Sequence, residues 1–187
     1  MGLYMMRPIL QANGLRTMLR TTGLWGTPFT MAELGSFAGE GVSIFLEAGA
    51  ECIYAVDLWQ QLTYREGIPA NARPDWAEAE FDRRLVEWQG AGREVVKIKK
   101  DTVEAAVNVA DASLDLVYVD AEHSFHAVVA DIAAWLPKLK PGGWMAGHDW
   151  SWVEVCRGVT AALGHLGPPY TFPDDSWLYR IENGTDP

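Results

Sequence analysis

The stretch Thr30–Asp57, TMAELGSFAGEGVSIFLEAGAECIYAVD, decides the fold of this chain. An apolar segment runs into a glycine-rich turn at residues 35–41, a helix-favouring segment follows, and a second apolar run ends at Asp57. Strand, glycine turn, helix, strand and terminal acid make up half of a nucleotide-binding α/β unit. The glycines let the backbone approach a ligand, and the N–H groups of the following helix face it. The carboxylate of Asp57 is therefore placed to accept hydrogen bonds from ribose hydroxyls.

The spacing of the glycines separates two kinds of nucleotide site. A dinucleotide fingerprint needs GxGxxG, whereas Gly35, Gly39 and Gly41 form GxxxGxG. This spacing argues against a nicotinamide-dependent dehydrogenase. A glycine turn between strand and helix also occurs for packing alone, and that alternative stays open.

Composition limits the class of protein. The 187 residues, 49% of them hydrophobic, suit one domain over residues 1–187 with a substantial core. A formal charge of −10 argues against a nucleic-acid partner, which needs a basic face. Two cysteines without CxxC spacing fit a reducing compartment, and no apolar run reaches the roughly 18 residues that span a bilayer. We expect a cytoplasmic protein with no membrane partner.

The remaining chain alternates between helical and strand patterns. Residues 1–28 form an N-terminal extension with a helix near 12–21, and the aromatic-containing segment 58–74 is either a substrate lid or a variable surface loop. Further elements are expected at 75–89 (helix), 94–98 (strand), 103–109 (helix), 114–119 (strand), 125–139 (helix), 144–147 (strand), 152–163 (helix), 170–172 (strand) and 177–181 (strand).

Acids occur at the ends of three expected strands, at Asp57, Asp120 and Asp149. The carboxyl ends of parallel strands lie at one edge of the sheet, where open α/β sheets bind ligands. Chance placement of all three acids is less probable than one shared ligand site. Ser124 is expected to cap the helix that follows Asp120, and Asp101 with Thr102, at the end of the strand 94–98, can serve as a cap of the next helix.

Two motifs resemble those of class I S-adenosylmethionine (SAM) methyltransferases over roughly residues 29–181. The first is Glu33-x-Gly35-x-x-x-Gly39, and the second is VDAEHSFHAVVADIAAWLPKLKPGGWMAGHD at residues 119–149, with its LKPGG turn. The D-x-x-H…HD arrangement further resembles the macrocin and mycinamicin O-methyltransferases and the related cephalosporin-hydroxylase-like proteins. The resemblance implies a Rossmann-like, doubly wound α/β fold whose seven-stranded sheet has the order 3-2-1-4-5-7-6, with helices on both faces.

The resemblance also implies roles for individual residues. Asp120 and Asp149 match two carboxylates that bind a divalent cation, usually Mg²⁺, in the metal-dependent members, and His123 matches the proposed general base. The implied SAM-binding residues are Glu33, Gly35, Ser36 and Gly39 for the methionine part, Asp57 for the ribose, and Asp101 with Thr102 for the adenine, with Asp120 beside them.

One departure affects the metal. His148 and Asp149 stand where those relatives usually carry Glu-Asp or Asp-Asp. Magnesium prefers oxygen ligands, so a set of Asp120, His148 and Asp149 suits manganese, iron or zinc better, or holds no metal at all.

The expected function is SAM-dependent O-methylation of a small hydroxylated molecule, with His123 as base and Asp120 beside it. A non-catalytic SAM-binding module or partner subunit is the alternative. His123 can also be a solvated residue at a helix N-terminus, His126 is expected at the surface, and homodimerisation to close the pocket is left open.

Overall fold

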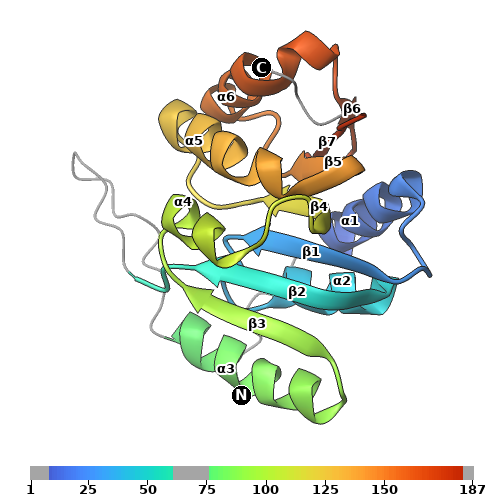
Figure 1. The fold of residues 1–187 in the computed structure, drawn as a ribbon, viewed down its shortest axis with the longest axis vertical. Coiled ribbons are helices and arrows are strands. Elements are labelled where there is room, and N and C mark those ends of the chain that lie inside the picture. The colour runs from blue at the N-terminus through green and yellow to red at the C-terminus, as the bar shows by residue number, and fades with distance from the viewer. Residues whose placement is uncertain (1–8, 61–75, 183–187) are drawn as a thin grey trace.

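The computed structural model describes residues 9–60 and 76–182. Its centre is a seven-stranded sheet with the order β3-β2-β1-β4-β5-β7-β6, which confirms the predicted order (Figure 1). The strands β1 to β5 are parallel, and β7 runs antiparallel to both β5 and β6. The strand bounds are β1 Phe29–Leu34, β2 Ala50–Asp57, β3 Glu94–Lys99, β4 Leu114–Val119, β5 Leu139–Gly147, β6 Tyr170–Thr171 and β7 Trp177–Arg180.

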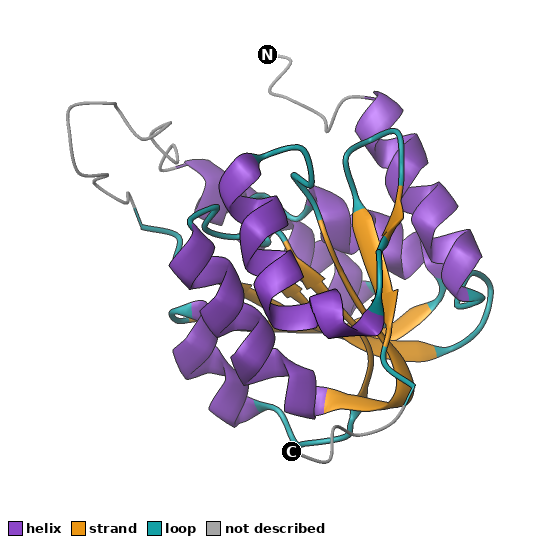
Figure 2. Cartoon of the chain, turned by 90° about the horizontal axis from the view of Figure 1, so that it is seen from above, coloured by secondary structure: helices purple, strands orange, loops and turns teal. Residues whose placement is uncertain are grey.

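Helices cover both faces of this sheet, as Figure 2 shows from above. One face packs against α1, α2 and α3, and the other against α4, α5 and α6. The helix bounds are α1 Ile9–Thr22, α2 Glu40–Ala48, α3 Trp76–Gly90, α4 Thr102–Ala105, α5 Phe125–Trp135 and α6 Val153–Leu163, with short 3-10 helices at Ala106–Asn108, Leu136–Lys138 and Gly164–Leu166.

The central strand β4 shows why both faces are covered. Its residues alternate between the two layers of the core, because successive side chains of a strand point to opposite faces. Leu116 and Tyr118 pack with the helices α1 to α3, whereas Val117 and Val119 pack with α4 to α6. All four side chains are buried, so this near-continuous apolar run is typical of a parallel strand buried on both sides.

The parallel strands bring the three predicted acids to one edge. Asp57 is the last residue of β2, Asp120 directly follows β4, and Asp149 lies two residues beyond β5. The neighbouring strands β2, β1, β4 and β5 all run in the same direction, so their carboxyl ends share this edge. The predicted clustering of strand-end acids at one edge is therefore confirmed.

The glycine-rich turn serves two different contacts. Gly35 has a φ of +91°, and a Cβ there would lie 2.0 Å from the backbone oxygen of Asp120, so the loop after β4 crosses directly over the turn. Gly39, with φ +84°, caps α2 in the left-handed conformation, and a Cβ there would lie 2.5 Å from the ring of Trp88. Both positions need glycine for backbone conformation and for close approach.

The LKPGG segment differs from its prediction. The sequence predicts a helix to residue 139 and then a turn, but α5 ends at Trp135 and the segment is already part of β5. Pro137 lacks an N–H group and its ring blocks a continued α-helix, so the chain tightens into a 3-10 turn. Backbone bonds from Gly142 N to Ile181 O (2.7 Å) and from Ile181 N to Gly143 O (2.9 Å) then hold the start of the strand.

Two predicted segments bear on the site. The expected N-terminal helix is present as α1, which packs on α2. Most of the predicted lid at 58–74 lies outside the described residues, which include only its first three positions, 58–60.

Among the helices of the described ranges, none is both long and apolar enough to cross a bilayer.

Candidate cofactor cavity and acid–base site

A cavity of about 490 Å³ lies at the carboxyl edge of the sheet, within the range of small-molecule sites. Its walls come from the glycine-rich turn, the loops after β2 and β4, the start of α4 and one face of α5. The lining residues are Gly35, Asp57, Leu58, Gln60, Asp101, Thr102, Val103, Ala121, Glu122, Ser124, His126, Ala127, Ala130 and Asp131.

Asp57 builds one wall of the cavity. Its carboxylate accepts backbone N–H bonds from Phe37 (2.9 Å, Oδ2) and from Trp59 (2.8 Å, Oδ1), and the indole N–H of Trp59 donates to the Phe37 carbonyl (2.7 Å). These bonds tie the glycine-rich turn to the loop after β2. Asp57 also lines the cavity, so its carboxylate belongs both to this loop contact and to the cavity wall.

The predicted cofactor residues fall into two groups. Gly35, Asp57, Asp101 and Thr102 line the cavity. The other four, Glu33, Ser36, Gly39 and Asp120, are not among its lining residues, and the first three of them are buried. Glu33 packs under α2, where its Oε1 would lie 1.8 Å from a Cβ at position 41, and it supports the turn from behind.

Asp101 and Thr102 open α4 beside the cavity. The Asp101 carboxylate accepts N–H bonds from Val103 (2.9 Å) and Glu104 (3.4 Å), which confirms the predicted helix cap. The hydroxyl of Thr102 forms a hydrogen bond with Asp131 on α5. The backbone oxygen of Thr102 accepts a bond from the indole of Trp135 (2.8 Å), so α4 and α5 are joined at this point.

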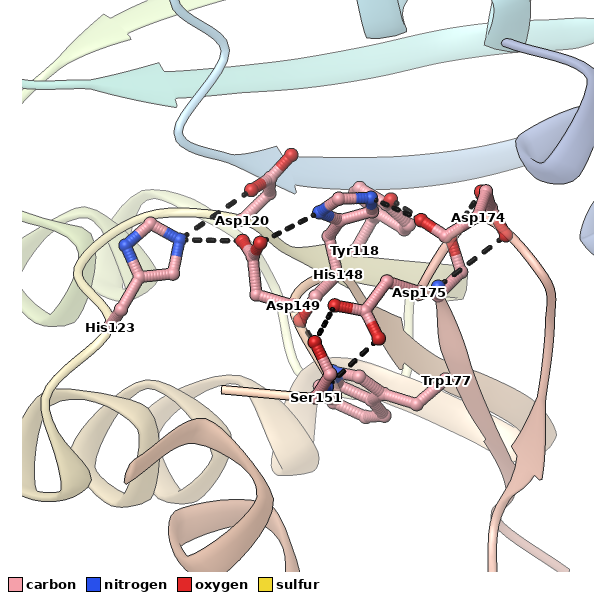
Figure 3. A network of polar contacts seen from close by, with 10 residues as sticks. Tyr118, Asp120, His123, His148, Asp149, Ser151, Asp174, Asp175 and Trp177 are labelled. Carbon is pink, nitrogen blue, oxygen red and sulfur yellow. Dashed lines mark hydrogen bonds and ion pairs between the residues drawn. The ribbon is translucent and has the colours of Figure 1, made fainter. Parts of the chain in front are cut away.

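Next to the cavity, His123 forms a close pair with Asp149. The ring nitrogen Nε2 lies 2.7 Å from Oδ2 of Asp149 and 4.0 Å from Oδ1 of Asp120 (Figure 3). The three side chains are between 17% and 32% exposed, so solvent or a small molecule can reach them. Figure 3 shows the second ring nitrogen of His123 turned away from both carboxylates.

His148 holds Asp149 in place from the buried side. Its Nε2 donates to the backbone oxygen of Asp174 (2.7 Å), because a carbonyl can only accept, and its Nδ1 lies 3.2 Å from Oδ1 of Asp149. The indole of Trp177 donates to the His148 carbonyl (3.1 Å). With both ring nitrogens engaged, His148 lies outside the group of potential metal ligands that converge here.

Among the described residues, Asp120, His123 and Asp149 offer ligand atoms that lie within 4.8 Å of one another. This set differs from the predicted one, since His123 takes the position expected for His148. Asp149 has a φ of +59°, in the left-handed region that asparagine and aspartate tolerate best. With this backbone conformation its side chain contacts His123.

The hydrogen bond between His123 and Asp149 shifts both groups. It raises the pKa of His123 above its ordinary value, outweighing burial, and the nearby charges of Asp149 and Asp120 add to the effect. Burial alone would raise the pKa of Asp149, but the hydrogen bonds from His123 and His148 hold it well below its usual range. Asp149 is therefore ionised at neutral pH, and Nε2 of His123 donates to it.

Comparison with known proteins identifies the family. A family model described as a methyltransferase domain matches residues 32–150, which include the glycine-rich turn, the cavity and the pair of His123 and Asp149. The chain belongs to this methyltransferase family.

A curated relative shares part of this sequence, and solved structures share its fold. Protein y4gI of Sinorhizobium fredii is 32% identical over 155 residues, and this match covers 78% of the methyltransferase chain but 16% of that relative. Calicheamicin methyltransferase CalS11, described in its apo form as a TDP-rhamnose 3′-O-methyltransferase, has a TM-score of 0.63 at 18% identity over 95% of this chain and 82% of its own. An rRNA methylase from Streptococcus thermophilus has a TM-score of 0.60 at 15% identity over 96% of this chain and 98% of its own. At these identities the two structures show the fold alone.

Three residues that lie at this site of the methyltransferase were given no role there by the sequence analysis. Trp152 stacks on the ring of His123 (centroids 5.2 Å apart, 15° between planes) and remains 56% exposed. His126 is exposed as expected, yet it also lines the cavity. Asp131 is buried in the cavity wall; its position among Val128, Ile132 and Trp135 on the buried face of a helix was a signal that sequence reading could have used.

Proposed function

We propose that this methyltransferase transfers a methyl group from SAM to a hydroxyl group of a small molecule, with His123 as the general base. The observation that carries the proposal is the 2.7 Å bond between His123 and Asp149, beside a cavity at the carboxyl edge of the sheet. We extend it to the domain organisation: residues 1–187 act as one SAM-binding domain, with 1–28 as a helical extension and 58–74 as a lid.

The residues around the cavity fit SAM. Gly35 lets the cofactor approach the backbone closely, because it has no side chain. Asp57 is suited to accept hydrogen bonds from the ribose hydroxyls, and Asp101 with Thr102 flanks the place for the adenine ring. Methyltransferase membership and the fold support SAM as the cofactor. When bound, SAM supplies a methyl group carried on a positively charged sulfur.

The ionised Asp149 defines which nitrogen of His123 acts. Since Nε2 carries a proton and donates to Asp149, the lone pair of the neutral ring is on Nδ1, which faces away from the carboxylates. Nδ1 accepts the proton of the acceptor hydroxyl while the oxygen–methyl bond forms and the sulfur–methyl bond breaks, leaving S-adenosylhomocysteine. Asp149 then stabilises the imidazolium, and the stacked Trp152 keeps the ring oriented.

The same three groups offer a donor set for a cation. Two carboxylates and one imidazole suit manganese, iron or zinc better than magnesium, which prefers oxygen ligands. Such an ion would be held by Asp120, His123 and Asp149, and would supply a Lewis acid for the acceptor oxygen. The hydrogen-bonded pair already provides a base without it, so the metal is the secondary part of this proposal.

The class of acceptor follows from charge and surface. A chain with a net charge of −10 is unsuited to a nucleic-acid backbone. The exposed indole of Trp152, directly beside the base, is suited to the apolar face of a sugar or polyketide-type ring. The likeness in fold to a TDP-rhamnose methyltransferase and the arrangement of Asp120, His123 and Asp149 support a place near the macrocin and mycinamicin O-methyltransferases.

The proposal is tested by following S-adenosylhomocysteine formation over a panel of sugar and polyketide-type alcohols. We expect SAM to bind at micromolar concentration and at least one alcohol to be methylated, with EDTA present. Turnover that needs added Mn²⁺ would instead assign the three groups to a metal. SAM binding without turnover on any acceptor would favour a non-catalytic module, and absence of SAM binding would reject the proposal.

The pKa of His123 predicts the pH dependence. His123 must be neutral to accept a proton, so kcat/KM is expected to rise with pH, with its midpoint above the ordinary histidine value. In Asp149→Asn the hydrogen bond that raises the pKa of His123 loses its charge. The midpoint of the pH–rate profile is therefore expected to move to lower pH. The limiting rate falls about 10- to 100-fold, the scale of one charge-assisted hydrogen bond. An unchanged midpoint in this variant would show that another group is the base.

A further inference from the structure

Asp131 is a buried acid that the proposed chemistry does not use. It lies on α5, its side chain is 2% exposed, and it lines the cavity proposed for SAM. An acid in such a position is rare in a helix unless it is paired or has a function.

The two carboxyl oxygens of Asp131 differ. Oδ1 forms a hydrogen bond with the Thr102 hydroxyl, and Thr102 is itself held by Trp135. Oδ2 is buried and has no hydrogen-bond partner in the described part of the chain. A buried oxygen without a partner is costly, so a ligand that completes its hydrogen bond would gain affinity here.

The surroundings of Asp131 favour its neutral form. Burial raises the pKa of its carboxyl to about 7, the hydrogen bond from Thr102 opposes this rise, and the charges of Asp101 and Glu122 add smaller increases. Asp57 from β2 and His126 on α5 also line the cavity, and the described lining residues include neither lysine nor arginine. Because Thr102 donates to Oδ1, the carboxyl proton resides on Oδ2.

We infer that Asp131, as a neutral carboxylic acid, donates a hydrogen bond from Oδ2 to an acceptor ring nitrogen of the purine in the bound cofactor. Asp131 is thus a cofactor-binding residue in addition to Asp101, whose carboxylate caps α4. The inference rests on the proposed function, because it takes the ligand of this cavity to be SAM or its product. A purine nitrogen is an acceptor, so the ionised form of Asp131 repels it and binding weakens as the carboxyl loses its proton.

The experiment measures the affinity of S-adenosylhomocysteine by calorimetry at about pH 6 and about pH 8.5, on either side of this titration. The wild type is expected to bind about tenfold more weakly at the higher pH. Asp131→Asn places an amide donor at the same position. At both pH values its affinity should equal the affinity that the wild type has at the lower pH. Asp131→Ala should bind about tenfold more weakly than the wild type at the lower pH.

A control variant and a second readout separate this role from general effects. Asp111→Asn changes an exposed acid paired with Lys138 (2.6 Å) and should retain the wild-type pH dependence. Between the ordinary value of 3.8 and about 7 the folded protein keeps a proton that the unfolded chain releases. Wild-type stability therefore falls as pH rises through this window, and Asp131→Asn should raise the melting temperature above pH 7 relative to the wild type but not near pH 4.

Three results would overturn the inference. A loss of affinity in Asp131→Asn at both pH values would show that an ionised oxygen accepts from the ligand. Equal affinities in all variants would show that Asp131 does not contact it. A pH-independent wild type would show that no titration takes part. If the wild type bound no S-adenosylhomocysteine at all, the proposed cofactor itself would be rejected, which is a distinguishable failure.

Discussion

Replacing His123 by glutamine is expected to lower kcat by about 10²- to 10⁴-fold, the usual contribution of a positioned general base. The amide of glutamine can still donate to Asp149, as Nε2 of His123 does at 2.7 Å. It has no lone pair that can take a proton from the acceptor hydroxyl. The affinity for S-adenosylhomocysteine should change little, because His123 is not among the residues that line the cavity. Initial rates with a saturating acceptor, together with calorimetry, measure the two quantities separately.

The matched control for this variant is His165→Gln. His165 lies in the 3-10 helix Gly164–Leu166 and is not among the residues that line the cofactor cavity. Its rate should stay within about twofold of the wild type, since surface substitutions away from a site have small effects. A His123→Gln enzyme with wild-type kcat would remove His123 from the mechanism. A variant whose loss lies entirely in the acceptor KM would make His123 a binding group.

The strand-end acids were predictable from the sequence because topology alone decides their location. Once β2, β4 and β5 are parallel strands of one sheet, Asp57, Asp120 and Asp149 must share its carboxyl edge. The glycine spacing and the apolar runs sufficed for that step. The caps at Asp101 and Ser124 were equally accessible, since a helix N-terminus asks for such side chains locally.

The partners within the site were not predictable from spacing. His148 and Asp149 are adjacent in sequence, which suggested a joint ligand set, but the β6–β7 segment provides the Asp174 carbonyl that engages the His148 ring. The left-handed backbone at Asp149 brings its side chain to His123 on another loop. Both facts depend on contacts between distant segments, which a residue pattern does not contain.

Helix α5 shows the same limit at smaller scale. Its apolar stripe predicts the buried face, but a stripe defined by apolar residues alone does not include Asp131 on that face. The predicted end of this helix, residue 139, lies four residues beyond the observed end at Trp135. Pro137 breaks the helix, although the apolar period of the sequence continues to Leu139. In this helix the exceptions to the periodic pattern are the informative residues: the acid marks a polar group in the buried face, and the proline marks the end of the helix.

Gly35→Ala is expected to destabilise the fold by about 3–5 kcal/mol and to abolish binding of S-adenosylhomocysteine, because Gly35 meets two requirements at once. Its φ of +91° disfavours any side chain, and an added Cβ would lie 2.0 Å from the Asp120 oxygen and 2.9 Å from the Ala121 Cα. Both are backbone atoms, so a rotamer change cannot relieve the contact. The loop that carries Asp120 and His123 must move, and the cavity wall moves with it.

Gly26→Ala separates the two requirements. Gly26 has a similar φ of +82°, but nothing lies within 4 Å of the place where its Cβ would be. This control should be destabilised only by the cost of the left-handed conformation, about 1–2 kcal/mol, and should keep its affinity for S-adenosylhomocysteine. Urea unfolding with unchanged slopes measures both losses on one scale. Equal destabilisation of the two variants would mean that the loop after β4 yields to the added methyl group, and the close approach of that loop to the glycine turn would then not be what requires glycine at position 35.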